Sequence, residues 1–491
     1  MAAEAGEAPA PAEVMAEQDG EAAAPELPVR RPHLPDGGPW SAAYRRTTAG
    51  LLLVIASGAF EVLAVGTILP ATVDDLGGLH LYGWAFSAYL LANLVGLVIA
   101  GNEADHRGPG APFVAGTLIF SAGLLLGGLA PTMLILILAR AIQGVGGGLV
   151  NAVAYVVVGR GYPEQARPRM LALMSTAWVV PGLVGPGLAG LVADHVGWRW
   201  VFLAIIPLPL LAAVLAVPPL YLIPAGSLLA RDWARLRNAA RVAAGMALML
   251  AGFGASSVRF GVPMAVIGLG VALPPLLRLL PPGTLSAQPG LPAAILVMAL
   301  LNLAFFGVDA FVPLALVDVR HTSTSFAGLA LTAATLTWTA GSWIQAHLVR
   351  RTGPRWLVQV GLATIAVGVL LTIAVIATGV PVASGVIAWG IAGLGIGLSY
   401  SALSLLVLEG APPGQEGSAS AAMQIANNVG ISLATGLGGI LIAVLSEQGT
   451  SSPESLVAQF ALMTIVLAVA LIVAHRLSSQ LRSEALGEPG A

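Results

Sequence analysis

The sequence predicts an all-α, polytopic membrane protein. Of its 491 residues, 57% are hydrophobic and only 9% are charged, whereas a soluble domain carries about 25% charged residues. Apolar runs of roughly 20 residues recur along the chain, and each is long enough to cross a hydrocarbon core of about 30 Å. Because a backbone in lipid must satisfy its own hydrogen bonds, we expect each run to be a helix.

Composition and motifs exclude several function classes. The chain has no cysteine, and its seven histidines form no cluster with metal-ligand spacing. No phosphate-binding G-x-x-x-x-G-K pattern occurs, and no loop is long enough to hold a soluble catalytic domain. We therefore predict that the protein is not an enzyme, that it uses no metal or cofactor, and that it binds no nucleic acid.

The two ends of the chain are predicted to be tails. Residues 1–46 are rich in Ala, Pro and Glu and have few large apolar side chains, so they cannot bury enough surface to fold. They lack the basic-then-apolar order of a cleavable signal peptide, and the first span is expected to be the targeting signal. Residues 1–46 and 479–491 are thus expected to be cytoplasmic tails.

Six apolar runs within residues 47–223 predict an N-terminal six-helix half. They cover residues 48–70, 82–101, 112–130, 133–158, 170–193 and 200–222. Residues 224–285 then form a cytoplasmic linker, with an arginine-rich break at 231–241, and two extra membrane helices at 242–256 and 262–280. A re-entrant pair is the alternative for these two shorter runs.

Residues 286–478 predict a C-terminal six-helix half. Its runs cover residues 291–317, 326–349, 357–378, 382–408, 418–446 and 456–474. The predicted total is fourteen spans, arranged as six plus two plus six. The loops after the second run of each half, "GNEADHRGPG" and "AHLVRRTGPR", resemble each other, as expected for parallel repeats with a site between them.

Arginine predicts the orientation, because cytoplasmic loops are enriched in positive charge. With the N-terminus inside, most loop arginines are cytoplasmic, and only Arg199, Arg259 and Arg320 lie outside. We therefore expect a multi-pass protein of a bacterial inner membrane, with both termini cytoplasmic. We expect it to be monomeric, with the lipid bilayer as its main surrounding.

The loop after the second run partly matches the pattern G-x-x-x-D-R-x-G-R-R. Gly101, Asp105, Arg107 and Gly108 belong to this segment, but His106 stands where the pattern has arginine and the final basic pair is missing. An aspartate at such a turn can pair with a helix N-terminus or a nearby cation. A solvated turn after a helix is the alternative.

The fourth run contains "RAIQGVGGG", which matches R-x-x-Q-G-x-G at Arg140, Gln143, Gly144 and Gly146. An arginine near the middle of a membrane costs at least about 2.5–3.5 kcal/mol, so it must face protein, a partner or a water-filled cavity. The alternative, in which Arg140 reaches the membrane surface, is opposed by the seven residues of apolar sequence before it.

The fifth run contains "PGLVGPGLAG", which is similar to G-x-x-x-G-P-x-x-G-G. The residues that carry this pattern are Pro181, Gly182, Gly185, Pro186 and Gly190. Proline interrupts the helix hydrogen bonds and glycine allows close helix contact. A purely structural role in a glycine-rich helix is the alternative.

These stretches, together with Glu61 nine positions before Pro70 in the first run, resemble the major facilitator superfamily and its fourteen-span drug:proton antiporters. The resemblance covers residues 48–476, although the family typically has aspartate where Glu61 stands. It implies two six-helix halves that move by alternating access. It also implies that the loop motif latches the halves and that the motif of the fifth run marks an exporter.

Glu61 and Asp309 are the two carboxylates well inside apolar runs, at equivalent places in the two halves. Burial disfavours the charged form of a carboxyl group, so such a group can take up and release a proton near neutral pH. We therefore predict proton coupling through Glu61, Asp309 or both, with Arg140 favouring the charged form of a nearby acid. Acids that only pack helices are the alternative.

Polar and aromatic residues inside the runs are candidates for a substrate cavity, since they suit small amphiphilic or cationic ligands. They are Gln143, Asn151, Trp178, Asn302, Trp338, Tyr400 and Asn427. Each could instead pack helices or anchor the protein at the membrane interface. Acidic residues at the ends of runs, Asp75 and Asp194 among them, are expected to be solvated.

The leading hypothesis from the sequence is a proton-coupled exporter of drugs or metabolites. An uptake or exchange permease of the same fold is the alternative. A non-transporting membrane sensor is a further alternative, disfavoured by the absence of a long loop.

Overall fold

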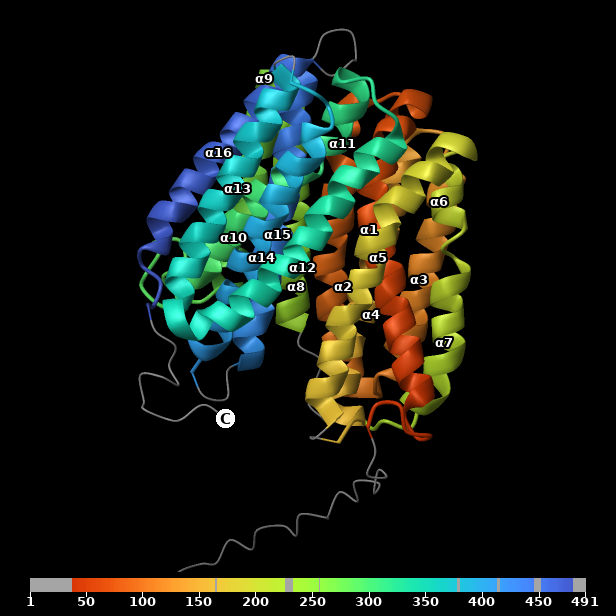
Figure 1. The fold of residues 1–491 in the computed structure, drawn as a ribbon. Coiled ribbons are helices and arrows are strands. Elements are labelled where there is room, and N and C mark those ends of the chain that lie inside the picture. The colour runs from red at the N-terminus through yellow and green to blue at the C-terminus, as the bar shows by residue number, and fades with distance from the viewer. Residues whose placement is uncertain are drawn as a thin grey trace, which may run out of the picture. The chain divides into compact units, whose positions relative to one another are not determined.

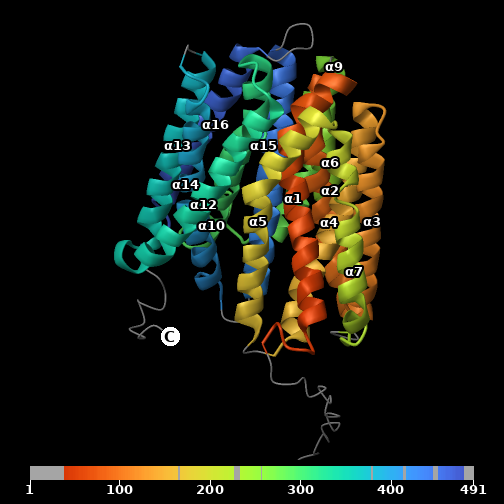
Figure 2. The ribbon, with the colours of Figure 1, turned by 45° about the vertical axis from the view of Figure 1, so that its right-hand side comes forward.

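The computed structural model describes residues 38–163, 166–225, 233–255, 257–377, 380–412, 416–445 and 452–479. These residues form long helices that run roughly along one common direction (Figures 1 and 2). Most of the two predicted tails, 1–46 and 479–491, lies outside the described residues.

The N-terminal half contains the helices from α1 to α7. Their bounds are α1 Arg45–Leu76, η1 Leu79–Leu81, α2 Trp84–Arg107, α3 Gly110–Gly128, α4 Met133–Gly161, α5 Arg167–His195, α6 Arg199–Leu203 and α7 Pro207–Leu220. The sixth predicted run is therefore divided into α6 and α7. Proline at the first position of α7 explains the break, because it has no N–H to continue the preceding helix.

The C-terminal half contains the helices from α10 to α16, after the hairpin of α8 Trp233–Phe253 and α9 Val258–Leu279. Their bounds are α10 Leu291–Asp309, α11 Val312–Leu314, the π-helical turn η3 Ala315–Val319, α12 Thr324–Thr352, α13 Pro354–Ala377, α14 Ser384–Glu409, α15 Glu416–Leu445 and α16 Pro453–Ala474. The first run of this half is thus interrupted directly after Asp309, near Pro313, where a backbone donor is missing.

Twelve helices of the described chain are long and apolar enough to cross a membrane. The hairpin helix α9 is one of them, whereas α8 and α12 fall outside this set. Helix α8 begins at Trp233 rather than at residue 242, so it includes part of the arginine-rich break. Helix α12 has 29 residues but is rich in Thr and Ser. The count of fourteen spans stays a prediction.

Hydrogen bonds join the two halves toward the end of the bundle that is uppermost in Figure 1, where the halves lie close together. Tyr82 Oη donates to the carbonyl of Ala310 at 2.9 Å, and Ser87 Oγ donates to the carbonyl of Ser432 at 2.9 Å. Deeper along the same pair of helices, Asn428 Nδ2 donates to Oδ1 of Asn93 at 3.2 Å. Helix α2 is therefore a main line of contact with the C-terminal half.

Small residues let the halves approach closely on two sides. At Gly83 an added Cβ would lie 2.0 Å from the carbonyl oxygen of Thr435, on α15. At Gly190 it would lie 2.7 Å from Cα of Ser325, on α12. The contacts between α2 and α15 and between α5 and α12 are thus backbone to backbone, which a larger side chain would prevent.

The hairpin of α8 and α9 packs against both halves at the seam between α2 and α15. A buried cluster there contains Leu94 of α2, Val242 and Met246 of α8, Ala272 of α9 and Ile425 of α15. The extra helices therefore belong to the helical body and cover one of the two lines of contact between the halves.

Close helix packing predicts opposite effects for two Gly→Ala substitutions within helices of the N-terminal half. At Gly144 of α4 the new Cβ would lie 2.1 Å from the carbonyl oxygen of Tyr89, whereas at Gly58 of α1 nothing lies within 4 Å. We expect Gly144→Ala to destabilise the protein by about 1–3 kcal/mol through overpacking. Gly58→Ala should be neutral or slightly stabilising, because alanine favours helix. Thermal unfolding of the purified protein tests this, and equal melting temperatures for the two variants would contradict the packing.

Candidate functional site

A buried polar centre lies inside the N-terminal half. Arg140 of α4 forms an ion pair with Glu61 of α1 through Nη1, and the same nitrogen donates to Oε1 of Gln143 at 2.7 Å. The exposed fractions are 0% for Glu61, 2% for Arg140 and 0% for Gln143. The structure thus brings together three residues that the sequence predicted to be functional. The sequence had assigned Glu61 and Arg140 to proton coupling and Gln143 to the substrate cavity.

Helix α2 completes the surroundings of Arg140. Nε donates to the carbonyl of Ala85 at 2.9 Å, and the guanidinium lies over the ring of Tyr89, 4.5 Å from its centroid. Such a contact adds a cation–π attraction to the hydrogen bonds. Gly144 makes this arrangement possible, because it brings α4 against the backbone of α2 at Tyr89. The charge of Arg140 is therefore satisfied within the protein.

The polar centre keeps unused hydrogen-bonding capacity. Among the described residues, Oε2 of Glu61 and Nε2 of Gln143 are buried and have no hydrogen-bond partner. A buried polar atom without a partner usually marks a functional position or a place for water or an ion. Oε2 of Glu61 is thus a buried acceptor, without a partner among the described residues, on a carboxylate that pairs with an arginine.

Asp309 has a different environment, at the end of α10. Its Oδ1 accepts a hydrogen bond of 2.8 Å from Nε1 of Trp389, on α14. Trp389 is fully buried and stacks on Phe305 with ring centroids 5.0 Å apart. The two predicted coupling acids therefore have separate partners, one set in each half.

The C-terminal half also brings together four of the residues predicted for a substrate cavity. Asn302 Nδ2 donates to Oδ1 of Asn427 at 2.9 Å, and Asn427 Nδ2 donates to Oη of Tyr400 at 2.9 Å. The ring of Trp338 lies 5.7 Å from that of Tyr400. Gln424 joins this group by accepting from Nδ2 of Asn427 at 3.1 Å.

Two predicted cavity residues lie apart from both groups. Asn151 is half-buried on α4, and Trp178 of α5 is 44% exposed. No hydrogen bond that the structure describes joins either of them to the Arg140 centre or to the Asn427 group. Their place in a cavity stays a prediction.

Sequence reasoning missed the aromatic residues Phe305 and Phe306. The ring of Trp338 lies 5.9 Å from Phe305 and 6.3 Å from Phe306. The adjacent pair in "LAFFGVDA" resembles any apolar helix. Its position three and four residues before Asp309 is the signal that could have identified it, since such positions share a helix face with the acid.

The glycine and proline motif of α5 lies at the contact with α12. A Cβ at Gly182 would lie 2.2 Å from Cγ2 of Thr335, and Gly328 of α12 approaches the carbonyl oxygen of Pro186. Asp194, at the end of the same helix, accepts from the backbone N–H of Ser325 at 3.0 Å and from its hydroxyl. The motif thus provides a close contact between the halves. The sequence predicted that Asp194 is solvated, whereas the structure shows it hydrogen-bonded to Ser325.

The loop motif lies at the end of α2. Asp105 forms an ion pair with Arg160 of α4, and Arg107 lies 3.6 Å from Glu103. Gly108 has a φ of +80°, which favours glycine, and at Gly101 nothing lies within 4 Å of an added Cβ. The partner of Asp105 therefore belongs to the N-terminal half itself.

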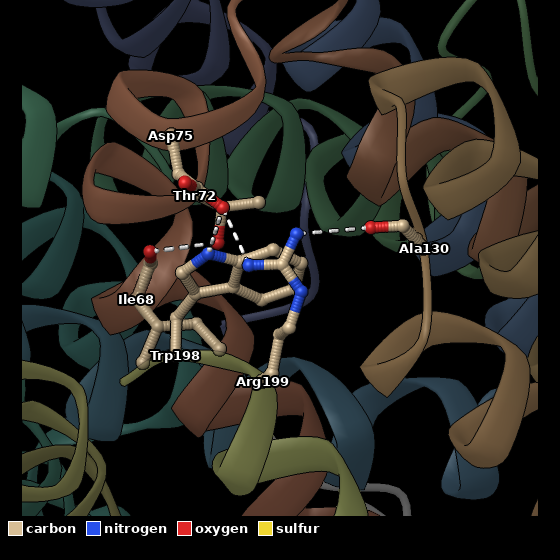
Figure 3. Close-up of polar contacts among 6 residues, drawn as sticks. All are labelled: Ile68, Thr72, Asp75, Ala130, Trp198 and Arg199. Atoms are coloured by element: carbon tan, nitrogen blue, oxygen red, sulfur yellow. Dashed lines mark hydrogen bonds and ion pairs between the residues drawn. The ribbon is translucent and has the colours of Figure 1, made fainter. Parts of the chain in front are cut away.

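Asp75, at the opposite end of the N-terminal half, was expected to be solvated but has specific partners (Figure 3). Its Oδ2 accepts from Nη1 of Arg199 at 2.5 Å and from Nε1 of Trp198 at 3.1 Å. Arg199 also donates to the carbonyl of Ala130 at 3.2 Å. The loop before α6 is thus tied to the ends of α1 and α3.

Apolar helices of spanning length, two halves joined by small residues, and buried charges inside the bundle define a multi-pass membrane transporter rather than an enzyme. The chain belongs to the major facilitator superfamily. The family model described as Major Facilitator Superfamily matches residues 50–435, with a further match over residues 295–487.

Curated relatives agree with this assignment. The chain is 27% identical to a multidrug transporter protein of Bacillus subtilis over 393 residues, which is 78% of this chain and 72% of that protein. It is 26% identical over 453 residues to a probable multidrug-efflux transporter of Mycobacterium tuberculosis, covering 87% of this chain and 94% of the relative.

Solved structures with the same fold include a transporter of the POT family in complex with 5-aminolevulinic acid. Its TM-score is 0.66 at 14% identity, with 88% of this chain and 96% of that chain covered. A bacterial homolog of the human lysosomal transporter Spinster, in an inward-facing and unoccupied conformation, has a TM-score of 0.60 at 15% identity and covers 88% and 96%. At these identities the likeness shows the fold.

The buried ion pair predicts strong coupling between Glu61 and Arg140 in stability. Glu61→Gln leaves Arg140 as an uncompensated buried charge, so we expect a loss of about 3–5 kcal/mol. Arg140→Met should also destabilise the protein. The double variant should lose less than the sum of the two single losses, because it removes both charges. A double-mutant cycle of thermal unfolding measures this, and additive losses would contradict a direct ion pair.

Proposed function

We propose that this protein is a proton-coupled exporter of drugs or metabolites that works by alternating access. The observation that carries the proposal is the fully buried pair of Glu61 and Arg140, in which one carboxylate oxygen has no described partner. Such an acid can exist in two states, ionised beside the arginine or protonated and released from it. A proton taken up here changes the charge balance of the whole centre.

The position of Arg140 suggests how this change reaches the contact between the halves. On α2, Arg140 contacts Ala85 and Tyr89, which flank Ser87 along the helix. Ser87, and Tyr82 just before α2, both bond the C-terminal half. Loss of the ion pair would therefore act on the same helix that holds the halves together, as alternating access requires.

Asp309 occupies a comparable position in the other half. It lies directly before Ala310, whose carbonyl accepts the hydrogen bond from Tyr82. The helix is interrupted at this point, because α10 ends at Asp309. Protonation of Asp309 would thus act on the C-terminal side of the same contact, which supports a coupling role for both acids.

Three observations support export from a bacterial cell. The relatives named above are multidrug and multidrug-efflux transporters. The motif that resembles the exporter pattern lies at the contact between α5 and α12. The arginine distribution favours cytoplasmic termini in the inner membrane, so that the closed contacts at Tyr82 lie on the outer side. Uptake by the same fold is the competing function.

Transport by the protein in lipid vesicles tests this function. With an imposed pH gradient, we expect wild-type protein to move a multidrug-type aromatic dye against the direction of proton flow. Glu61→Gln should abolish gradient-driven accumulation, because it removes the ionised state, and Asp309→Asn should reduce it. Downhill exchange of dye should persist in both variants if they are folded, which monodisperse elution confirms.

The matched control is Asp74→Asn, which neutralises an exposed acid at the end of α1. It should transport as the wild type does. Intact gradient-driven transport after neutralising both Glu61 and Asp309 would disprove proton coupling through these acids. Accumulation in the same direction as proton flow would support an uptake permease instead.

A further inference from the structure

Hydrogen bonds in the C-terminal half form a chain with a fixed direction. Asn302 Nδ2 donates to the carbonyl of Met298 at 2.8 Å and to Oδ1 of Asn427 at 2.9 Å. A backbone carbonyl can only accept, so Asn302 must present its N–H groups on this side. Asn427 therefore turns its oxygen toward Asn302 and its amide nitrogen away from it.

At the far end of this series of hydrogen bonds, two donors have no acceptor among the residues that the structure describes. Asn427 Nδ2 donates to Oη of Tyr400 at 2.9 Å and to Oε1 of Gln424 at 3.1 Å. Because Oη of Tyr400 receives this bond, its own O–H is oriented toward another acceptor. Because Oε1 of Gln424 also accepts from Asn427, the NH₂ group of Gln424 points away from Asn427.

The exposure of these side chains shows which end of the hydrogen-bonded series a ligand can reach. Asn302 and Asn427 are 1% and 7% exposed, whereas Tyr400 is half-buried and Gln424 is exposed. Gln424 lies one helical turn before Asn428, which bonds Asn93 of α2. Gln424 thus lies on the side of α15 that faces the N-terminal half, and Tyr400 of α14 is joined to it through Asn427.

Aromatic rings border the same donors. Trp338 lies 5.7 Å from Tyr400 and 6.3 Å from Phe306 by ring centroids, and all three side chains are half-buried. Aromatic faces beside a few fixed hydrogen-bonding groups are typical of small-molecule sites. We name this surface of Phe306, Trp338, Tyr400 and Gln424 the aromatic donor site.

We propose that the aromatic donor site binds a planar aromatic molecule through an uncharged hydrogen-bond acceptor, such as a carbonyl oxygen. Its polar contacts are the hydroxyl of Tyr400 and the amide of Gln424, and both are neutral donors. A cation offers no acceptor to these donors, and the two carboxylates inside the spans have other partners: Glu61 pairs with Arg140, and Asp309 accepts from the indole of Trp389. That this ligand is also transported rests on the function proposed above.

Equilibrium dialysis with the purified full-length protein tests the site with three matched probes. The probes are 9-fluorenone, fluorene, which lacks the carbonyl, and N-methylacridinium, a planar cation. We expect fluorenone to bind about tenfold more tightly than fluorene, as one added neutral hydrogen bond allows. Tyr400→Phe, which removes only the hydroxyl, should lose most of this preference. Trp338→Ala should weaken both neutral probes.

Tyr221→Phe is the matched control, because it removes a hydroxyl from a tyrosine that lies just after α7 and is 62% exposed. This variant should still bind fluorenone more tightly than fluorene. Equal binding of fluorenone and fluorene, an unchanged preference in Tyr400→Phe, or tighter binding of N-methylacridinium would each overturn the proposal. Asp74→Asn, at an exposed acid near the end of α1, should retain fluorenone binding within about twofold. Absence of proton-coupled transport by the wild-type protein, with this binding preference intact, would contradict only the proposed function.

Discussion

A guanidinium in the middle of an apolar helix bundle must be satisfied by the protein around it, and the packing of the N-terminal half follows from this requirement. Arg140 is 2% exposed and is held by Glu61, Gln143, the carbonyl of Ala85 and the ring of Tyr89. These partners come from α1, α2 and α4, so one charge sets the relative positions of three helices. Removing its carboxylate partner would leave an expensive buried charge.

Helix α2 transmits this constraint to the other half of the molecule. Ala85 and Tyr89 of α2 contact Arg140, whereas Ser87 between them contacts α15. Tyr82, just before α2, bonds Ala310 at the end of α10. The extra hairpin of α8 and α9 covers the seam between α2 and α15. The Glu61–Arg140 pair, the contact between the halves and the added helices are therefore neighbours, whereas the aromatic donor site lies in the opposite half.

The sequence predicted the helices well because apolar runs of spanning length leave few alternatives in lipid; α4 begins at Met133 and α10 at Leu291, as expected. It failed at the start of α8, since long arginine stems extend a helix beyond its apolar part. The sequence identified Glu61, Arg140 and Gln143 as candidate functional residues, because burying a charged or polar side chain in a membrane costs free energy. The pairing of Glu61 with Arg140, 79 positions apart, was not, because one sequence does not encode which helix faces meet. For the same reason, the sequence did not predict the aromatic contacts of Phe305 and Phe306 or the partners of Asp75.

We propose that the ion pair of Glu61 and Arg140 controls which end of the bundle is closed. The chain has no cysteine, so spin labels can be placed at Asp74 and Glu454 near one end, and at Gly159 and Leu408 near the other, without background. Distances between the labels of each pair should change in opposite directions on acidification in the otherwise wild-type protein, and should become insensitive to pH in Glu61→Gln. The same pH-dependent opposite changes in Glu61→Gln would contradict the account.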